Sequence, residues 1–443
     1  MCRMSSMQLS SAIPRTDATM DVVNNERIAL VLTGGGARGA YEAGAVSVLV
    51  PELERLGQRP SLFVGTSVGA MNAAYLAAAH HLSAEDAAAG MLQRWRDVSP
   101  EHVMRPLHHQ LPLNATRYLG EVLALPGVRL SSLLDPAPLE QRLQQWIDLA
   151  QLHHNIAHAG VDALAVIATA VRRGRTVVFV ESTAQRSLHR SHALDYTPAT
   201  IDHVHLRASA ALPVLFPAVR IDSPPQASGW YVDGGTRLNA PIKPALDLGA
   251  DRIVVIGTDA ITAPSDEPAQ YEGRTPDLAD GALHVLEGAL VDPLAEDIVM
   301  LGNINLFYTD PSIAHATQQY RYVRGKPPYR RVPYIFVAPD KRGAMGEHAL
   351  NSFHASNHKL SLRALRHRVI RHLLGGDSPA HGELLSYLHF EPDYLEELIA
   401  MGQRDARHYL DHAASSDHPW QIGPLPALTG VPDFAAEPDQ ESR

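Results

Sequence analysis

The sequence predicts an α/β protein in which helices cover both faces of a mainly parallel central sheet, a three-layer α/β/α arrangement followed by a helical C-terminal annex. Two observations lead to this prediction. Short apolar segments end at glycines and run into helix-forming stretches, which is typical of buried parallel strands that turn into helices. From residue 350 onward, the apolar residues recur with helical spacing only.

The first two units of this fold each consist of a strand, a tight turn and a helix. Residues 28–32, Ile-Ala-Leu-Val-Leu, form a short apolar run ahead of three consecutive glycines. Residues 62–64 repeat the pattern, because the run stops at Gly65 and is followed by the alanine-rich, proline-free segment 68–79. Strands interleaved with helices in this way favour a parallel sheet covered on both sides.

Later segments supply the rest of the sheet and the annex. Residues 164–170 and 176–180 predict two strands joined by a turn. The segment 261–280 is rich in Pro, Asp and Glu and predicts a loop. β-Branched and aromatic runs predict further strands at 230–232, 252–256 and 334–337. A helix over residues 394–410 would place four apolar residues on one face: Leu395, Leu398, Ile399 and Ala406.

Composition narrows the classes of protein to which the chain can belong. Its 443 residues are 45% hydrophobic and 19% charged. The charged share lies below the roughly 25% of average soluble chains, which argues against a disordered polyelectrolyte. The 38 basic and 48 acidic residues give a net charge of −10, so no overall positive field is available to bind nucleic acid. Cys2 is the only cysteine, which excludes an intrachain disulfide and a cysteine metal cage.

The N-terminal residues 1–25 are polar and unpatterned, and we expect them to form a flexible leader. Pro14, Arg15 and Asp17 interrupt this segment before an apolar stretch of secretory length can form. No apolar run in the sequence approaches the ~18 residues of a transmembrane helix. We therefore predict a cytoplasmic protein and leave peripheral membrane contact and specialised secretion open.

The sharpest local signal is a G-x-S-x-G pattern at the end of the second predicted strand. Small neighbours allow a strained turn that lifts the Ser67 hydroxyl clear of the backbone, and the helix that follows directs its first amides toward developing negative charge. Ser67 is therefore the candidate nucleophile. The pattern alone leaves open a glycine-rich turn with an idle serine. The elbow consists of Gly65, Thr66, Ser67, Val68 and Gly69.

A glycine-rich loop follows the first predicted strand. Only glycines let successive backbone N–H groups converge on one point, so this loop is the candidate anion cradle. Its G-x-G-x-x-G spacing also fits a dinucleotide site, but such a site needs an acid at the end of the next strand, where this chain has Gly65 and Thr66. A Walker-type phosphate loop would need a Gly-Lys-Ser/Thr ending. The loop comprises Gly34, Gly35, Gly36, Ala37, Arg38 and Gly39.

Asp233 is the candidate base, which a serine nucleophile needs within hydrogen-bond reach. It ends the predicted strand 230–232 and is followed by Gly234 and Gly235, which let its carboxylate face the carboxyl edge of the sheet. The alternative is an ordinary Asp-Gly turn, which is the commoner meaning of that dipeptide.

Together, the three motifs resemble the patatin-like phospholipase family, and its bacterial members in particular. That family combines a glycine-rich oxyanion loop, a G-x-S-x-G elbow and a later D-G-G or D-G-A, in the order found here. The resemblance extends to residues 207–213, Arg-Ala-Ser-Ala-Ala-Leu-Pro, and to Phe216-Pro217. Near the end of the chain it includes residues 390–394 and 400–402.

The resemblance implies a serine lipid acyl hydrolase that acts on a lipid ester and needs no cofactor or metal. Ser67 would be the nucleophile, Asp233 its sole partner in a Ser-Asp dyad, and residues 34–39 the oxyanion hole. Arg38 would shape the loop, meet substrate phosphate or form a structural ion pair. Because Asp233 would act without a histidine, a partly desolvated carboxylate with a raised pKa would suit the reaction. A transacylase with the same dyad and a lipid-binding protein without turnover remain alternatives.

The resemblance also suggests how the chain divides. Residues 26–345 would form a catalytic domain, in which 80–162 and 261–280 are insertions or loops that match no family motif. Residues 346–411 would form the helical annex, and residues 412–443 a loose tail. The sequence predicts no oligomeric state.

The histidines offer a chemical rival to the dyad. A hydrolase triad of Ser, Asp and His would place its histidine after the acid. His154 and His158 stand at i and i+4 but have no third metal ligand, so we expect them on the surface. Four of the histidines that follow Asp233 are candidates, and none lies in a recognisable loop after a final strand: His284, His348, His354 and His358.

Two basic segments could contact a membrane. Residues 360–374 interleave apolar residues with arginines, as a helix lying on a membrane surface would, although a solvated helix packed on the sheet fits equally well. The second basic stretch contains Arg321, Arg324, Lys326, Arg330 and Arg331.

Overall fold

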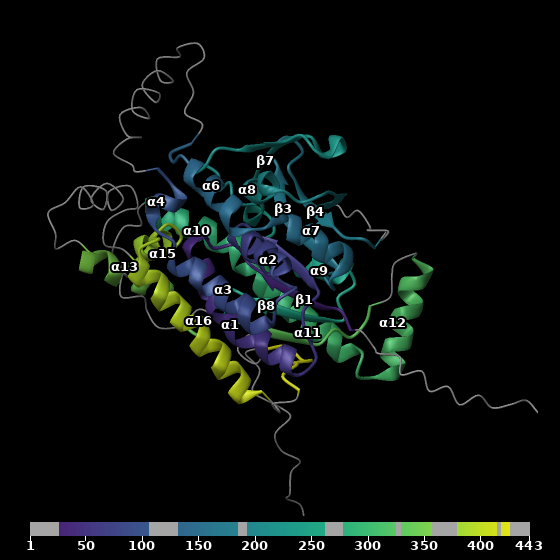
Figure 1. Ribbon diagram of the computed structural model, residues 1–443. Helices are drawn as coiled ribbons and strands as arrows, with labels where there is room; N and C mark the ends of the chain where they lie inside the picture. Colours follow the sequence, from purple (N-terminus) through teal and green to yellow (C-terminus); the bar gives the residue numbers. More distant parts are fainter. Residues whose placement is uncertain are drawn as a thin grey trace, which may run out of the picture.

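Figure 1 shows the computed structural model, in which helices lie on both sides of a central sheet. The fold is α/β with a mixed, mainly parallel sheet, which confirms the predicted class. No helix within the described ranges is long and apolar enough to cross a lipid bilayer. The structure describes residues 26–105, 132–184, 193–261, 278–324, 329–356, 379–413 and 418–425.

The strands form one sheet with the order β5-β4-β3-β2-β1-β8-β9, and β7 pairs with both β3 and β6. Five neighbouring pairs are parallel, including those of β1 with β2 and with β8, whereas β3 pairs with β4 and β7 in antiparallel fashion. The strands are β1 (Ile28–Leu32), β2 (Leu62–Thr66), β3 (Ala163–Ala170), β4 (Arg175–Glu181), β5 (Leu194–Pro198), β6 (Val219–Ile221), β7 (Gly229–Asp233), β8 (Arg252–Ile256) and β9 (Tyr334–Val337).

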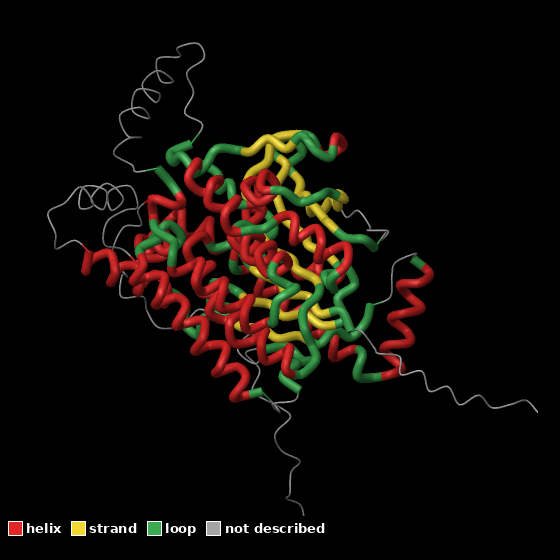
Figure 2. Tube along the Cα trace, viewed as in Figure 1, coloured by secondary structure: helices red, strands yellow, loops and turns green. Residues whose placement is uncertain are grey.

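Helices cover the two faces of this sheet, as Figure 2 shows in red around the yellow strands. The α-helices are α1 (Gly39–Arg55), α2 (Val68–Ala78), α3 (Ala84–Arg96), α4 (Pro100–Val103), α6 (Ala137–Trp146), α7 (Leu149–His158), α8 (His203–Ser209), α9 (Ile242–Asp247), α10 (Leu278–Leu290), α11 (Asp292–Phe307), α12 (Pro311–Val323), α13 (Ala344–Ser356), α15 (Pro379–Ser386) and α16 (Pro392–His412). Short 3-10 helices are η1 (Gly36–Arg38), η2 (Pro225–Ala227) and η3 (Gly234–Thr236).

The alternation of side chains along β1 shows why both faces must be covered. Leu30 and Leu32 belong to the apolar core that includes α1, α2 and α16, whereas Ala29 and Val31 belong to the opposite core with α9 and α11. A strand that is apolar on both sides can be buried only between two helical layers. The residues of β1 are all buried.

All seven predicted strands are present, with bounds within two residues of those expected from the sequence. The short strands β5 and β6 were not predicted. The stretch 80–162 contains α3, α4, α6 and α7 in its described part. The basic segment 360–374, His358, Lys326 and most of the predicted loop 261–280 lie outside the described residues.

The C-terminal helices pack directly on the first helix of the sheet domain. Glycines allow α1 and α16 to approach closely, because a Cβ at Gly402 would lie 2.1 Å from the Tyr41 carbonyl oxygen, and one at Gly44 would lie 2.1 Å from that of Ile399. Residues 418–425, within the predicted loose tail, also pack on the body. There Gln421 pairs with Tyr334 at the start of β9 through two backbone hydrogen bonds of 2.8 and 2.9 Å.

Candidate active site

Ser67 occupies a sharp turn between β2 and α2. Its backbone φ of 54° and ψ of −126° lie in a region that L-residues rarely adopt, which is the strain expected of a nucleophile elbow. The flanking glycines make the turn possible. A Cβ at Gly65 would lie 2.3 Å from the Gly69 carbonyl oxygen, and one at Gly69 would lie 2.4 Å from that of Thr33. The Thr66 hydroxyl donates to the Leu238 carbonyl at 2.9 Å.

Ser209, at the end of α8, holds this turn from the other side. The Ser67 backbone N–H donates to Ser209 Oγ at 2.8 Å, and the Ser209 hydroxyl donates in turn to the Ile167 carbonyl on β3 at 2.6 Å. The role of Ser209 was not predicted. One indication of Ser209 came from the sequence, because this residue lies in segment 207–213, which is typical of the family.

Asp233 reaches Ser67 because of the strand order. β2 pairs with β3 up to Thr66, opposite Ile167, and β7 takes over the same edge of β3 at the next position, where Asp233 lies opposite Ala168. The C-terminal end of β7 therefore meets the C-terminal end of β2. As a result, the Ser67 hydroxyl donates a 2.7 Å hydrogen bond to Asp233 Oδ2, across 166 positions of sequence.

The two glycines after Asp233 support its carboxylate. The Gly235 N–H donates to Asp233 Oδ1 at 2.7 Å, so each carboxylate oxygen accepts one hydrogen bond. A Cβ at Gly234 would lie 2.5 Å from the Ile167 carbonyl oxygen, which leaves room only for glycine there.

The carboxyl group of Asp233 is buried, with 3% of the residue exposed. Burial raises its pKa to about 6, while the hydrogen bonds from Ser67 and Gly235 act in the opposite direction. A carboxylate in this range is ionised at neutral pH and is still basic enough to accept a proton from a neighbouring hydroxyl.

The glycine-rich loop lies beside Ser67, but most of its amides are already engaged. A Cβ at Gly34 would lie 3.1 Å from Ser67 Cβ. The Gly34 N–H donates to Asn239 Oδ1 at 2.9 Å, that of Ala37 to the Tyr387 carbonyl at 3.0 Å, and that of Arg38 to the Gly35 carbonyl at 3.1 Å.

Because these amides are engaged, fewer N–H groups of the loop are available to bind an anion than the sequence predicted. The Gly39 N–H bonds within η1, to the carbonyls of Ala37 and Gly36. In the part of the chain that the structure describes, only the amides of Gly35 and Gly36 in this loop have no recorded acceptor. Including Gly34, Ala37, Arg38 and Gly39 as donors was therefore too broad, because their N–H groups hold the loop in shape instead.

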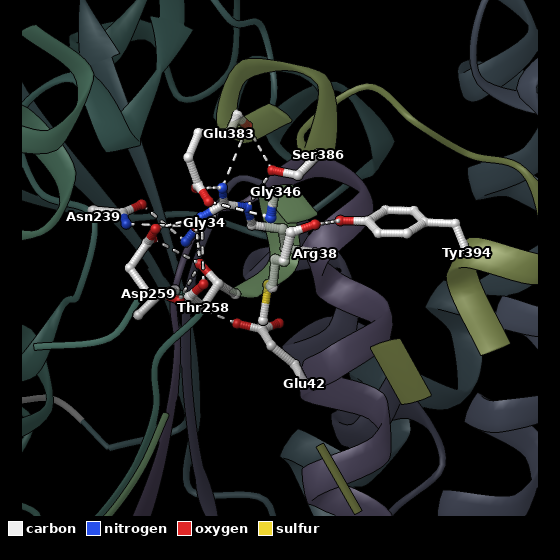
Figure 3. Close-up of polar contacts among 12 residues, drawn as sticks. Gly34, Arg38, Glu42, Asn239, Thr258, Asp259, Gly346, Glu383, Ser386 and Tyr394 are labelled. Atoms are coloured by element: carbon white, nitrogen blue, oxygen red, sulfur yellow. Dashed lines mark hydrogen bonds and ion pairs between the residues drawn. The ribbon is translucent and has the colours of Figure 1, made fainter. Parts of the chain in front are cut away.

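The Arg38 side chain lies in a buried polar cluster (Figure 3). It forms ion pairs with Asp259 and Glu383, and its Nε donates to Ser386 Oγ at 2.7 Å. Its side chain is only 1% exposed. Of the roles considered for Arg38, the structural ion pair is the one observed.

A second buried carboxyl lies behind the loop. Glu42 Oε2 accepts from Asn72 Nδ2 at 2.8 Å, and Glu42 Oε1 accepts from the Thr33 hydroxyl at 3.4 Å. Asn72 also accepts from Trp95 Nε1 at 3.1 Å. Burial raises the pKa of Glu42 to about 8, against the hydrogen bonds that lower it. No pattern in the sequence pointed to this group, which is protonated at neutral pH.

Three of the four histidines of the rival triad lie in the described part of the chain, and none of them has a described contact with Ser67 or Asp233; His358 lies outside the described residues. His348 faces Glu397 at 3.9 Å, and the ring of His354 lies edge-on to Phe353. His284 has an exposed side chain on α10. Over the described ranges, no group of three or more His, Cys, Asp or Glu side chains is placed to hold a metal ion.

Comparison with models of protein families identifies the family of the region that contains the site. The model described as patatin-like phospholipase matches residues 30–246, a range that includes the glycine loop, Ser67 and Asp233. Residues 30–246 belong to the patatin-like phospholipase family. No curated protein is significantly similar to this patatin-like chain. The helices α10 to α16 lie beyond the matched range.

Among solved structures, the patatin-like chain is similar to VipD from Legionella pneumophila, with 14% identity, a TM-score of 0.27, and coverage of 85% of this chain and 67% of that one. It is also similar to the type III effector protein ExoU, with 16% identity, a TM-score of 0.25, and coverage of 88% and 76%. A third similar structure is ExoU in its complex with SpcU, from the type III secretion system of Pseudomonas aeruginosa. It has 18% identity and a TM-score of 0.25, with coverage of 88% of this chain and 74% of that one. At these TM-scores the likenesses carry no conclusion of their own.

Replacing Glu42 by glutamine should remove part of the pH dependence of stability. The pKa of Glu42 in the folded protein, about 8, exceeds its ordinary value of 4.5. The stability contributed by Glu42 is therefore fully present below pH 4.5 and is lost as the pH rises through 8. Chemical unfolding at pH values of about 5 and 8.5 should show a smaller loss of unfolding free energy in Glu42→Gln than in the wild type.

The matched control for this measurement is Glu85→Gln, at an exposed glutamate in α3. It should follow the wild type at both pH values. Equal losses in wild type and Glu42→Gln would contradict the assignment of a raised pKa to Glu42.

Proposed function

We propose that this patatin-like protein is a serine lipid acyl hydrolase of the phospholipase, lysophospholipase or esterase type, with Ser67 and Asp233 as its catalytic dyad. The observation that carries the proposal is the 2.7 Å hydrogen bond from the Ser67 hydroxyl to the buried Asp233 carboxylate. Membership of the family supports hydrolysis of a lipid ester. The strained backbone at Ser67 supports its role as nucleophile.

Acylation would begin when Asp233 Oδ2 takes the Ser67 hydroxyl proton as Ser67 Oγ bonds to the ester carbonyl carbon. The carbonyl oxygen becomes an oxyanion, which the amides of Gly35 and Gly36 would stabilise by hydrogen bonds. When the tetrahedral intermediate collapses, the bond from carbon to the alcohol oxygen breaks. The leaving alcohol takes the proton from Asp233, and the acyl group remains on Ser67.

Deacylation would repeat these steps with water. Asp233 accepts a proton from a water molecule whose oxygen attacks the acyl carbon, and the same two amides receive the oxyanion. The bond from carbon to Ser67 Oγ then breaks. Ser67 recovers its proton from Asp233, and the fatty acid leaves. One carboxyl group therefore serves as base and acid in both halves of the reaction.

Two variants test the dyad. Ser67→Ala and Asp233→Asn should each reduce hydrolysis of phospholipids and of a soluble p-nitrophenyl ester by at least about 10²–10⁴-fold, because the first lacks the nucleophile and the second cannot accept its proton. Mass spectrometry of the products from a mixed lipid extract measures the turnover and identifies the ester bond cleaved. Labelling by a fluorophosphonate should occur in the wild type and be absent from Ser67→Ala.

Matched controls are Ser312→Ala and Asp222→Asn, at exposed positions outside the site. Both should retain wild-type turnover. Full activity in Asp233→Asn would overturn the dyad. Transfer of the acyl group to an added alcohol in preference to water would identify the protein as a transacylase. The absence of both fluorophosphonate labelling and ester turnover would favour a lipid-binding function.

The pH profile tests Asp233 as the base. Because the ionised form accepts the proton, kcat/KM for a neutral ester should rise with pH and reach half its maximum near the Asp233 pKa of about 6. A flat profile between about pH 5 and 8 would contradict this role.

Asp233→Asn should also be at least as stable as the wild type at pH 8, because the raised pKa means that the ionised carboxylate disfavours the folded state above pH 6.

A further inference from the structure

The loop that carries Gly35 and Gly36 is held by residues from the far end of the chain. The Ala37 N–H donates to the Tyr387 carbonyl at 3.0 Å, just after α15. Arg38 contacts the same helix through Ser386 and Glu383, 348 and 345 positions later in the sequence. The first loop residue to make such a contact is Ala37, which directly follows Gly36.

The contact between loop and helix leaves little space for movement. Gly36 has a φ of +58°, and a Cβ there would lie 2.2 Å from the Tyr387 carbonyl oxygen. The Arg38 guanidinium also lies over the Tyr387 ring, 4.1 Å from its centre. The backbone at Gly36 therefore rests directly on the chain that leaves α15.

Arg38 joins two parts of the molecule electrostatically. One of its carboxylate partners, Asp259, follows β8 in the central sheet, and the other, Glu383, belongs to α15. Figure 3 shows the guanidinium between them. Because Arg38 is almost fully buried, its charge depends on both carboxylates for compensation. A change in the position of α15 would therefore be transmitted to the loop.

α15 is itself held in place by the other annex helices. The backbone N–H of Gly346, in α13, donates to Glu383 Oε1 at 3.1 Å. The hydroxyl of Tyr394, in α16, donates to the Met345 carbonyl at 3.2 Å. Glu383 thus binds Arg38 with one carboxylate oxygen and α13 with the other. α16 in turn packs against α1, which begins at Gly39.

We propose that Glu383 and Ser386 are positioning residues that act through Arg38 to fix the amides of Gly35 and Gly36 for the oxyanion. The inference rests on the proposed function and extends it to the annex, which lies outside the matched family range. Neither residue contacts Ser67 or Asp233 among the described contacts. The C-terminal annex is, in this account, part of the machinery that makes the site competent for transition-state stabilisation.

The test compares Glu383→Gln with Glu396→Gln in the full chain. Glu396 also belongs to the annex and forms an ion pair with Arg96 at 2.8 Å, but this pair is exposed, and neither residue has a described hydrogen bond to residues 34–39. With a soluble p-nitrophenyl ester, Glu383→Gln should lower kcat by about 10²-fold, the effect of losing one oxyanion donor, and leave KM within about twofold. Glu396→Gln should behave as the wild type.

A second readout does not depend on turnover. Hydrogen–deuterium exchange of the amides of residues 33–41 should be faster in Glu383→Gln than in the wild type or Glu396→Gln, because the loop has lost one of its tethers. If the wild type lacks esterase activity, the proposed function fails, and this exchange measurement still decides whether α15 holds the loop.

The outcomes are distinct. Wild-type kcat and wild-type exchange in Glu383→Gln would overturn the inference, as would equal effects of Glu383→Gln and Glu396→Gln. If Glu383→Gln does not fold, Ser386→Ala decides by the same two readouts, because it removes a single hydrogen bond to Arg38 Nε and leaves both carboxylates in place. Restoration of kcat in Glu383→Asp, which keeps the charge, would support the electrostatic tether.

Discussion

The hydrogen bond between Ser67 and Asp233 forms only because two strands share one edge of β3. β2 occupies that edge up to Thr66, and β7 continues it in the opposite direction from Asp233. The ends of the two strands that carry Ser67 and Asp233 therefore meet at one point. The elbow at Ser67 and the glycines after Asp233 refine this arrangement, but the sheet register determines it.

This arrangement places unfavourable features in the middle of a well-packed fold. Ser67 has a strained backbone, and Asp233 and Glu42 are buried carboxyl groups whose pKa values are raised by burial. Local strain and buried titratable groups persist where the surrounding structure determines them fully. Here the surrounding structure includes hydrogen bonds from Gly235 and Asn72 to the two carboxyl groups, and one from the Ser67 N–H to Ser209 Oγ. We interpret the strain and the raised pKa of Asp233 as part of the proposed mechanism.

The sequence predicted the parts of the site that depend on local pattern. The elbow, the glycine loop and Asp233 could be identified because each motif requires special backbone geometry at the end of an apolar strand. The short edge strand β5, Leu-Asp-Tyr-Thr-Pro, has no comparable pattern and was missed.

The remaining contributors to the site could not be predicted because they act through contacts distant in sequence. Asn239 binds the Gly34 amide across 205 positions, and Glu383 binds Arg38 across 345. Neither lies in a motif that specifies its partner. For the same reason the sequence could not show which loop amides are engaged, and the predicted anion cradle was too broad. The contacts between the loop and α15 become visible only when both are placed in space.

The most direct test of the account is a crystal structure of the protein after reaction with a fluorophosphonate, whose covalent adduct resembles the tetrahedral intermediate. We predict that phosphorus is bonded to Ser67 Oγ, that Asp233 Oδ2 lies within hydrogen-bond distance of that oxygen, and that the phosphoryl oxygen accepts hydrogen bonds from the amides of Gly35 and Gly36. An adduct on another residue, or a phosphoryl oxygen directed away from these two amides, would contradict the account.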